Sequence, residues 1–257
     1  TQAVNLMMKP VYLVSSPITG IMLLALSRVG QSRPDFERYV VKFYRMVGIL
    51  LLPAGIGLTI VGRDLMLVLG GEPWRLAGLV LMALAPTVLV QGFLNIAGSV
   101  FAASGRTGRL FAAAATTAMV LVAGCLLGFW LGNRFGDAVF GPTLGIAGSY
   151  CFACILLFFP YMVFCFRTVD VSISRVFKPL LRPALSAILM GVAVLGLRAI
   201  AEIVEASPLP CLAISVTTGA VIYGWLTRRD ISWLVAELKG AEAQEGDVQP
   251  VGEMKEP

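Results

Sequence analysis

The feature that most limits the fold of this chain is a series of long apolar runs separated by short polar segments. A helix needs about 20 apolar residues to cross the hydrocarbon core of a bilayer. Seven runs reach that length, at residues 8–27, 46–69, 76–103, 110–132, 144–166, 184–204 and 209–227. Only helices or closed barrels can satisfy their backbone hydrogen bonds there. The sequence therefore predicts an all-α, polytopic membrane helix bundle of about seven transmembrane helices, over residues 1–230.

Composition supports a membrane protein over a soluble one. Hydrophobic residues make up 58% of the chain and charged residues 14%, against about 45–50% and about 25% in soluble domains. The mean hydropathy is +0.85. The formal charge of +5 is therefore interpreted as a property of membrane loops, and no nucleic-acid partner is predicted. We expect an interfacial amphipathic helix over 231–239 and a disordered cytoplasmic tail over 240–257.

The basic residues predict how the chain is oriented. Fifteen of the 20 basic residues fall in alternate connections and in the C-terminal tail, on one side of the predicted membrane. The densest group lies in a loop expected between the first two runs, residues 28–45. Cytoplasmic loops carry an excess of Lys and Arg, so we expect a cytoplasmic C-terminus. An odd number of crossings that starts outside predicts an upstream helix, so we expect this chain to be part of a longer protein or a truncated product.

Proline and glycine residues occur within several of the apolar runs. Pro10 and Pro17 interrupt the first run, and Pro53 to Gly57 lie within the second. Broken helices at mid-depth are typical of secondary transporters that line a substrate cavity. In the fourth run Gly124, Gly128 and Gly132 recur at intervals of four, and such a stripe of small residues predicts close approach of a neighbouring helix.

Polar residues within apolar runs are candidates for a substrate cavity, because burying them in hydrocarbon is costly. Gln91 and Asn95 are four residues apart and share one helical face. They could form a polar wall of the cavity, or hydrogen bonds that fix helix packing. Lys9 lies near the outer, N-terminal end of the first run. It could bind an anionic group or extend to the lipid headgroups.

Other polar residues have simpler interpretations. Thr116, beside Thr117, could line the cavity or back-bond to its own helix. Tyr150 is a further candidate for the cavity wall. Arg63 and Asp64 are interpreted as an interfacial charge pair.

Catalytic and metal chemistry are not predicted. The chain has no His, and the C-x-x-C of Cys151 and Cys154 lies in an apolar run, so no metal site or cofactor is expected. No phosphate-binding glycine loop of the P-loop type occurs. No loop is long enough for a soluble catalytic domain, and the outer loops are too short for a polymerase or glycosyltransferase. We therefore do not expect an enzyme.

A set of punctuating residues gives the chain a family resemblance. These are Val11-Tyr12-Leu13, Pro17, Leu26-Ser27-Arg28, Pro53, Gly57, Leu69-Gly70-Gly71-Glu72-Pro73-Trp74, Asn95, Phe101-Ala102-Ala103-Ser104-Gly105-Arg106 and Gly145-Ile146-Ala147-Gly148-Ser149. In their joint order they resemble the polysaccharide and O-antigen flippases of the multidrug/oligosaccharidyl-lipid/polysaccharide exporter superfamily. The resemblance covers residues 1–230, and corresponds to most of the second lobe of a two-lobed transporter.

The resemblance implies a function and partners. It implies that the C-terminal portion of a flippase moves undecaprenyl-diphosphate-linked oligosaccharide across the bacterial inner membrane, for lipopolysaccharide or exopolysaccharide synthesis. Cationic residues would hold the diphosphate, and Lys9 and Arg45 are placed near a cavity mouth. The implied partners are membrane lipids, the lipid-linked oligosaccharide and a separate first helix bundle. A multidrug or metabolite exporter and a truncated, non-transporting membrane component remain alternatives.

Overall fold

The computed structural model describes residues 33–105, 107–136, 141–203 and 208–236. The predicted first span at 8–27, with Lys9, and the predicted tail at 240–257 lie outside the described residues. Within these ranges the secondary structure is helical throughout and contains no strand. Among the described residues, five helices are long and apolar enough to cross a membrane, and a bent helix pair makes a sixth candidate. The predicted fold class, an all-α polytopic membrane bundle, is confirmed.

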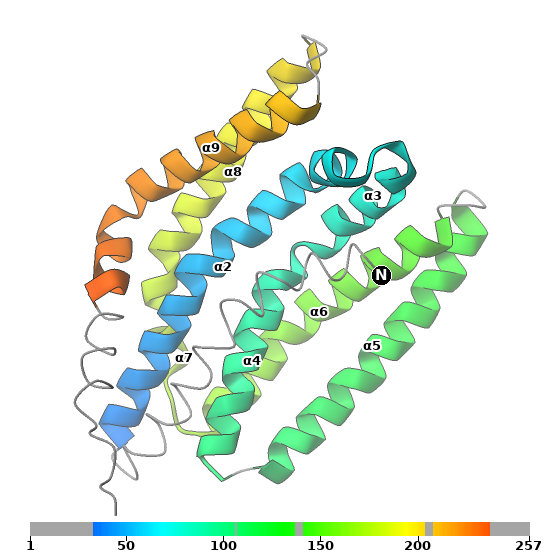
Figure 1. Ribbon diagram of the computed structural model, residues 1–257. Helices are drawn as coiled ribbons and strands as arrows, with labels where there is room; N and C mark the ends of the chain where they lie inside the picture. Colours follow the sequence, from blue (N-terminus) through cyan, green and yellow to red (C-terminus); the bar gives the residue numbers. More distant parts are fainter. Residues whose placement is uncertain (1–32, 106, 137–140, 204–207, 237–257) are drawn as a thin grey trace, which may run out of the picture.

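The long helix α2 (Arg33–Gly70) is the centre of the bundle. Figure 1 shows α8 and α9 on one side of α2, and α3, α4 and α6 on the other. The expected loop at 28–45 is wrong from Arg33 onward, because α2 already begins there. Val40, Tyr44 and Val47 are fully buried, and this spacing of four and three residues places all three on one face of a helix. Packing on that face therefore extends the helix into the basic segment.

The third predicted run is divided rather than continuous. A short 3-10 turn, η1 (Glu72–Trp74), leads into α3 (Arg75–Leu84), and α4 (Thr87–Ala103) follows after a bend of 53°. Pro86 lies at the break and has no backbone N–H to continue the helical ladder. The hydroxyl of Thr87, fully buried, donates to the carbonyl of Leu84 at 2.6 Å. The predicted run at 76–103 therefore consists of two helices joined by a bend, which together can form one span.

The remaining helices complete the bundle. They are α5 (Thr107–Phe135), α6 (Gly141–Thr168), α7 (Ile173–Phe177), the 3-10 turn η2 (Lys178–Leu180), α8 (Leu181–Ile203) and α9 (Pro208–Leu226). A last helical segment covers 228–236. Six of the seven predicted runs correspond to helices in the structure. These are α2, the bent α3–α4 pair, α5, α6, α8 and α9.

Glycines hold α5 close to α6, as the stripe in the sequence predicts. A Cβ at Gly128 would overlap the Ser149 side chain and the Gly145 carbonyl, and one at Gly132 would overlap the Gly141 carbonyl. At Gly124 a Cβ would lie 3.3 Å from that of Ala153. The two backbones approach closely because these positions carry no side chain.

An aromatic cluster joins α2 to α4 and α6. The ring of Tyr44 stacks on Phe93 with centroids 5.7 Å apart, and meets Phe166 edge-on at 5.4 Å. The Tyr44 hydroxyl donates to the Phe93 carbonyl at 3.3 Å. The buried tyrosine thus has a partner for its polar end while its ring fills the core.

Two ion pairs hold α2 near opposite ends of its apolar stretch. Arg45 contacts Asp230 of the 228–236 segment at 2.6 Å, and Asp64 contacts Arg198 of α8 at 3.0 Å. Arg198 also donates to the carbonyl of Ile60. The interpretation of Arg63 and Asp64 as a pair is therefore wrong. Successive residues on a helix point in different directions, so Asp64 faces α8 instead.

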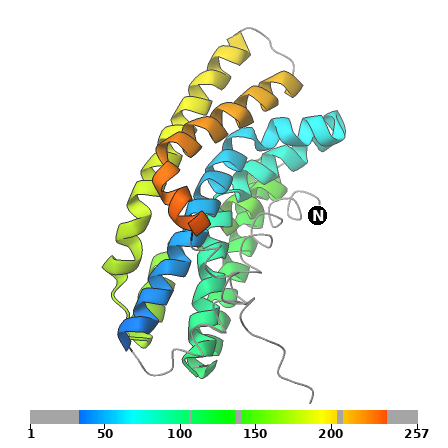
Figure 2. The same ribbon diagram turned by 60° about the vertical axis from the view of Figure 1, so that its left-hand side comes forward.

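The 228–236 segment packs on α2. Leu234 is buried in the main core cluster, with Ile231 and Trp233 packed against it. Figure 2 shows this last segment of the described chain lying against α2. The expected amphipathic character is present, and its apolar side contacts protein. The interfacial position of this helix stays a prediction.

Replacing Gly128 should loosen the α5–α6 contact. We expect Gly128→Ala to lower stability by about 1–3 kcal/mol, the usual cost of overpacking a close contact. Thermal unfolding of the purified chain in detergent measures the change. Gly148→Ala is the matched control on α6, because a Cβ there would meet nothing within 4 Å. Equal stability of the two variants would contradict the close-contact interpretation.

Removing Asp64 should be costly because Arg198 would lose its partner in a mostly buried site. The two side chains are only 12% and 14% exposed, and breaking such a pair costs about 3–5 kcal/mol. Glu37→Gln is the control, because its partner Arg175 is 70% exposed and exposed pairs contribute about 0–1 kcal/mol. Chemical unfolding in detergent compares Asp64→Ala, Arg198→Ala and the double variant. Simple additivity of the two losses would show that the pair does not interact.

Candidate functional site

A polar face on α4 contains two of the predicted cavity residues. Gln91, Asn95 and Ser99 follow one another at intervals of four and therefore share a face. The Gln91 amide donates to the hydroxyl of Tyr150 on α6 at 3.0 Å. The structure therefore brings Gln91 and Tyr150 together as an interhelical contact, and places Asn95 one turn further along α4.

Asn95 is exposed on a helix of a membrane-spanning pair. A Cβ at Gly98, beside it on the helix, would meet nothing within 4 Å, so the described residues leave this part of α4 open. An exposed amide facing hydrocarbon is unfavourable. This face of α4 therefore suits contact with water or with a polar partner.

Thr116 is satisfied within its own helix. Its hydroxyl donates to the carbonyl of Ala112 at 2.9 Å, and Thr117 likewise donates to Ala113 at 2.8 Å. The back-bonding interpretation is therefore confirmed for both residues. Thr116 is exposed on α5, a helix whose apolar stretch is not buried within the chain.

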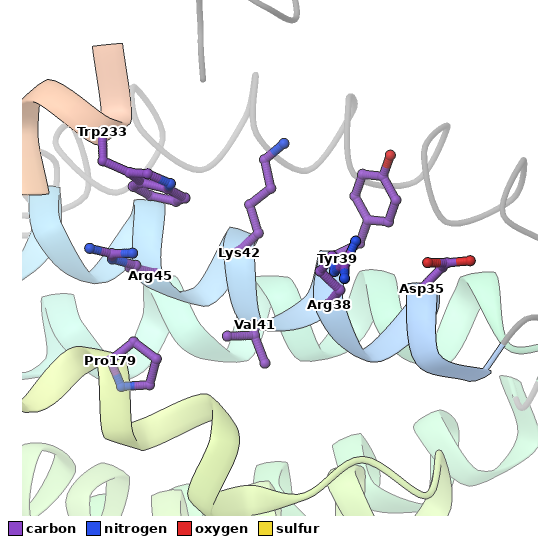
Figure 3. A pocket seen from close by; sticks show the side chains of 8 residues that line it. All are labelled: Asp35, Arg38, Tyr39, Val41, Lys42, Arg45, Pro179 and Trp233. Atoms are coloured by element: carbon purple, nitrogen blue, oxygen red, sulfur yellow. The ribbon is translucent and has the colours of Figure 1, made fainter. Parts of the chain in front are cut away.

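Arg45, the last described candidate, lies in a cationic pocket at the N-terminal end of α2 (Figure 3). The cavity measures about 600 Å³. Its lining residues are Asp35, Arg38, Tyr39, Val41, Lys42, Arg45, Pro179 and Trp233. Figure 3 shows the Trp233 ring lying over the guanidinium of Arg45, 4.2 Å from the ring centroid. Cation–π stacking and the ion pair with Asp230 thus fix Arg45 in place.

Arg38 and Lys42 belong to the same pocket but were not singled out from the sequence. Positions 38, 42 and 45 are spaced by four and three residues, which places them on one side of a helix. That spacing could have identified the pocket if the segment had been interpreted as helical. The Lys42 ammonium also lies 5.6 Å from the centre of the Tyr39 ring.

An apolar groove adjoins the cationic pocket. It has a volume of about 600 Å³ and lies between α2, α8, α9 and the 228–236 segment. Representative lining residues are Ile49, Pro53, Met190, Leu212, Val216 and Leu234. The Tyr223 hydroxyl, which would otherwise add a polar group to the groove, donates to the Ile49 carbonyl at 2.7 Å.

No metal site is found among the described residues. These ranges contain no group of three or more His, Cys, Asp or Glu side chains that could hold an ion. Cys151 and Cys154 are free, buried thiols on α6. The described part of the chain offers a polar wall, a cationic pocket and an apolar groove.

Comparisons with known proteins find similar proteins in polysaccharide biosynthesis. A family model described as polysaccharide biosynthesis protein matches residues 1–78. The teichuronic acid biosynthesis protein TuaB of Bacillus subtilis (strain 168) is 27% identical over 182 residues, covering 71% of this chain and 36% of TuaB. The predicted resemblance to a polysaccharide biosynthesis family is confirmed at this level.

A solved structure shows the same fold. The lipid II flippase MurJ, in an inward closed conformation, superposes with a TM-score of 0.64 at 15% sequence identity. The match covers 89% of this chain and 46% of the MurJ chain. This protein therefore spans about a third of TuaB and less than half of MurJ. The described residues thus form a multi-pass membrane bundle, similar in sequence to proteins of polysaccharide biosynthesis and in fold to MurJ.

Cysteine labelling tests whether the polar face of α4 contacts water. With the native cysteines replaced, we expect Asn95→Cys to react with a membrane-impermeant maleimide in membrane vesicles, because this face suits an aqueous lining. Leu126→Cys on α5 is the control, since Leu126 is 66% exposed on a helix suited to face lipid. Protection of both cysteines would show that the α4 face is covered or lipid-facing.

Proposed function

We propose that this chain is the C-terminal portion of a flippase for undecaprenyl-diphosphate-linked oligosaccharide. It would act in the bacterial inner membrane, carrying the lipid-linked sugar from the cytoplasmic to the outer leaflet for surface polysaccharide synthesis. The polysaccharide-type family match, the TuaB relative and the MurJ fold support this proposal. The distribution of basic residues supports a cytoplasmic C-terminus.

The exposed amide of Asn95 is the observation that carries the proposal. It lies on α4 next to the Gln91–Tyr150 contact, on a helix pair that is bent at Pro86. Amide and phenol groups suit the hydroxyls of a sugar, since each can both donate and accept hydrogen bonds. Bent, interrupted helices are what secondary transporters use to line cavities. A wall of this kind would contact the oligosaccharide during its passage.

The proposed wall consists of Gln91, Asn95 and Tyr150. Thr116 is not included, because its hydroxyl is occupied within α5. Arg45 already has the carboxylate of Asp230 as its counter-ion, so we assign it to holding the pocket together rather than to the diphosphate. Lys9 stays a predicted contact for the diphosphate. We further propose that a first helix lobe, on the same or another chain, faces α4 and completes the cavity.

Reconstitution tests this function. The chain together with a first lobe from a related flippase should exchange a fluorescent undecaprenyl-diphosphate oligosaccharide between the leaflets of proteoliposomes. Gln91→Ala combined with Asn95→Ala should slow exchange about tenfold, equivalent to about 1.4 kcal/mol, with unchanged protein abundance. Ser99→Ala is the control, because the Ser99 hydroxyl donates to a carbonyl of its own helix.

Two outcomes would oppose this assignment. Exchange of cationic drugs but not of the lipid-linked sugar would move the protein to the exporters of the superfamily. A loss of abundance in the double variant, with normal exchange by the remaining protein, would show that the polar face serves helix packing.

A further inference from the structure

The cationic pocket and the apolar groove are lined by neighbouring residues of the same two elements. Arg45 lines the pocket and Ile49, one turn further along α2, lines the groove. On the 228–236 segment, Trp233 lines the pocket and its neighbour Leu234 lines the groove. The two cavities therefore lie next to each other along the same pair of elements. A molecule with a charged end and an apolar end could occupy both.

The charge of the pocket selects an anion. Among the described residues, its lining includes the cations of Arg38, Lys42 and Arg45 and one carboxylate, that of Asp35. Guanidinium groups bind phosphate through two parallel hydrogen bonds, and Lys adds a compact positive charge. Arg45 is held by Asp230 at 2.6 Å and stacked on Trp233, so this wall of the pocket is ordered in advance of binding.

From the spacing of charged residues on α2, we place the pocket at the depth of the lipid headgroups. Arg45 and Asp64 bound the apolar stretch of α2 and are 19 positions apart, which is about 28 Å along a helix. The hydrocarbon core of a bilayer is about 30 Å thick. Trp233 and Tyr39, which line the pocket, are of the residue types enriched at the membrane interface.

We propose that the pocket and the groove together bind one anionic phospholipid of the surrounding bilayer. Its phosphate contacts Arg38 and Lys42, and an acyl chain lies along Ile49, Met190 and Leu234 in the groove. This site is separate from the sugar-facing wall on α4. Lipid binding at this site requires no transport cycle, so its test does not depend on the proposed function.

A phospholipid fits better than the lipid-linked sugar. The described residues that line the pocket include no Asn, Gln, Ser or Thr, the side chains that both donate to and accept from sugar hydroxyls. Its polar groups are mainly cationic donors, which suit phosphate oxygens. The groove is lined almost wholly by apolar side chains, apart from Ser215 and the occupied Tyr223. The cationic pocket therefore matches the headgroup of an anionic phospholipid, and the apolar groove matches its acyl chain.

The bound lipid would join elements that are distant in the sequence. Its headgroup would contact α2 beside the Arg45–Asp230 pair, and its chain would contact α8, α9 and the 228–236 segment. Arg182 at the start of α8 also approaches Asp230, at 3.9 Å. Lipid binding would thus stabilise the junction of α2 with the α8–α9 pair.

Native mass spectrometry of the full chain, released from detergent, tests the proposal. Phosphatidylglycerol should bind at least about tenfold more tightly than phosphatidylcholine, and should raise the unfolding temperature more. Arg38→Gln with Lys42→Gln should remove this preference. Arg109→Gln with Arg167→Gln is the matched control, because it removes two exposed cations outside the pocket. The control variant should retain the preference.

Salt supplies a test that needs no variant. Raising the ionic strength from about 0.05 M to about 0.5 M screens charge interactions, so the preference of the unmodified protein for phosphatidylglycerol should shrink while apolar binding persists. Inorganic phosphate should compete only weakly, because it lacks the acyl chain.

Several results would overturn the proposal. Equal binding of phosphatidylglycerol and phosphatidylcholine would do so. An equal loss of the phosphatidylglycerol preference in the Arg38/Lys42 variant and in the Arg109/Arg167 control would also do so. Full displacement of the lipid by millimolar inorganic phosphate would indicate a soluble anion site instead. Binding of undecaprenyl diphosphate but not of phosphatidylglycerol would assign the pocket to the transported lipid.

Discussion

The hydrocarbon core of a membrane provides no water for charged or polar groups, and the arrangement of this chain follows from that constraint. Along α2, the charged residues with defined partners lie near the two ends of the apolar stretch. Arg45 is paired with Asp230 at one end, and Asp64 with Arg198 at the other. Both partners come from elements late in the chain, so the same contacts that neutralise α2 also attach the α8–α9 pair to it. Polar residues between these ends require a hydrogen-bonding partner, as the Thr59 hydroxyl has in the carbonyl of Gly55.

Hydrophobic length predicts most of the fold. Six apolar runs correspond to observed spans because each is long enough to cross the bilayer, and few alternatives satisfy the backbone in that environment. Glycine spacing also predicts the α5–α6 contact, since a bare helix face is useful only where another backbone lies against it. The bend at Pro86 is harder to predict. Proline is tolerated in membrane helices, and the size of a bend depends on tertiary packing.

The candidate sites are less predictable than the fold. Intramembrane polarity singles out Gln91, Asn95 and Tyr150, and the structure joins Gln91 to Tyr150. Polarity alone does not reveal which side chains already have a hydrogen-bond partner, however. Thr116, for example, donates its hydroxyl to a carbonyl of its own helix. The partners of Arg45 and Asp64 are remote in sequence. The cationic pocket was overlooked because residues 33–45 were interpreted as a loop, which hid the helical spacing of Arg38, Lys42 and Arg45.

The fixed separation of the two ion pairs on α2 has a consequence for the membrane itself. Because Arg45 and Asp64 are joined by continuous helix, their spacing of about 28 Å cannot lengthen or shorten with the bilayer. A thicker membrane would bring one pair towards the acyl chains, and a thinner one would expose apolar side chains between them. Such hydrophobic mismatch is relieved by tilting the helix or deforming the lipid. Since α8 and the 228–236 segment are attached at these two points, any tilt of α2 would carry them with it.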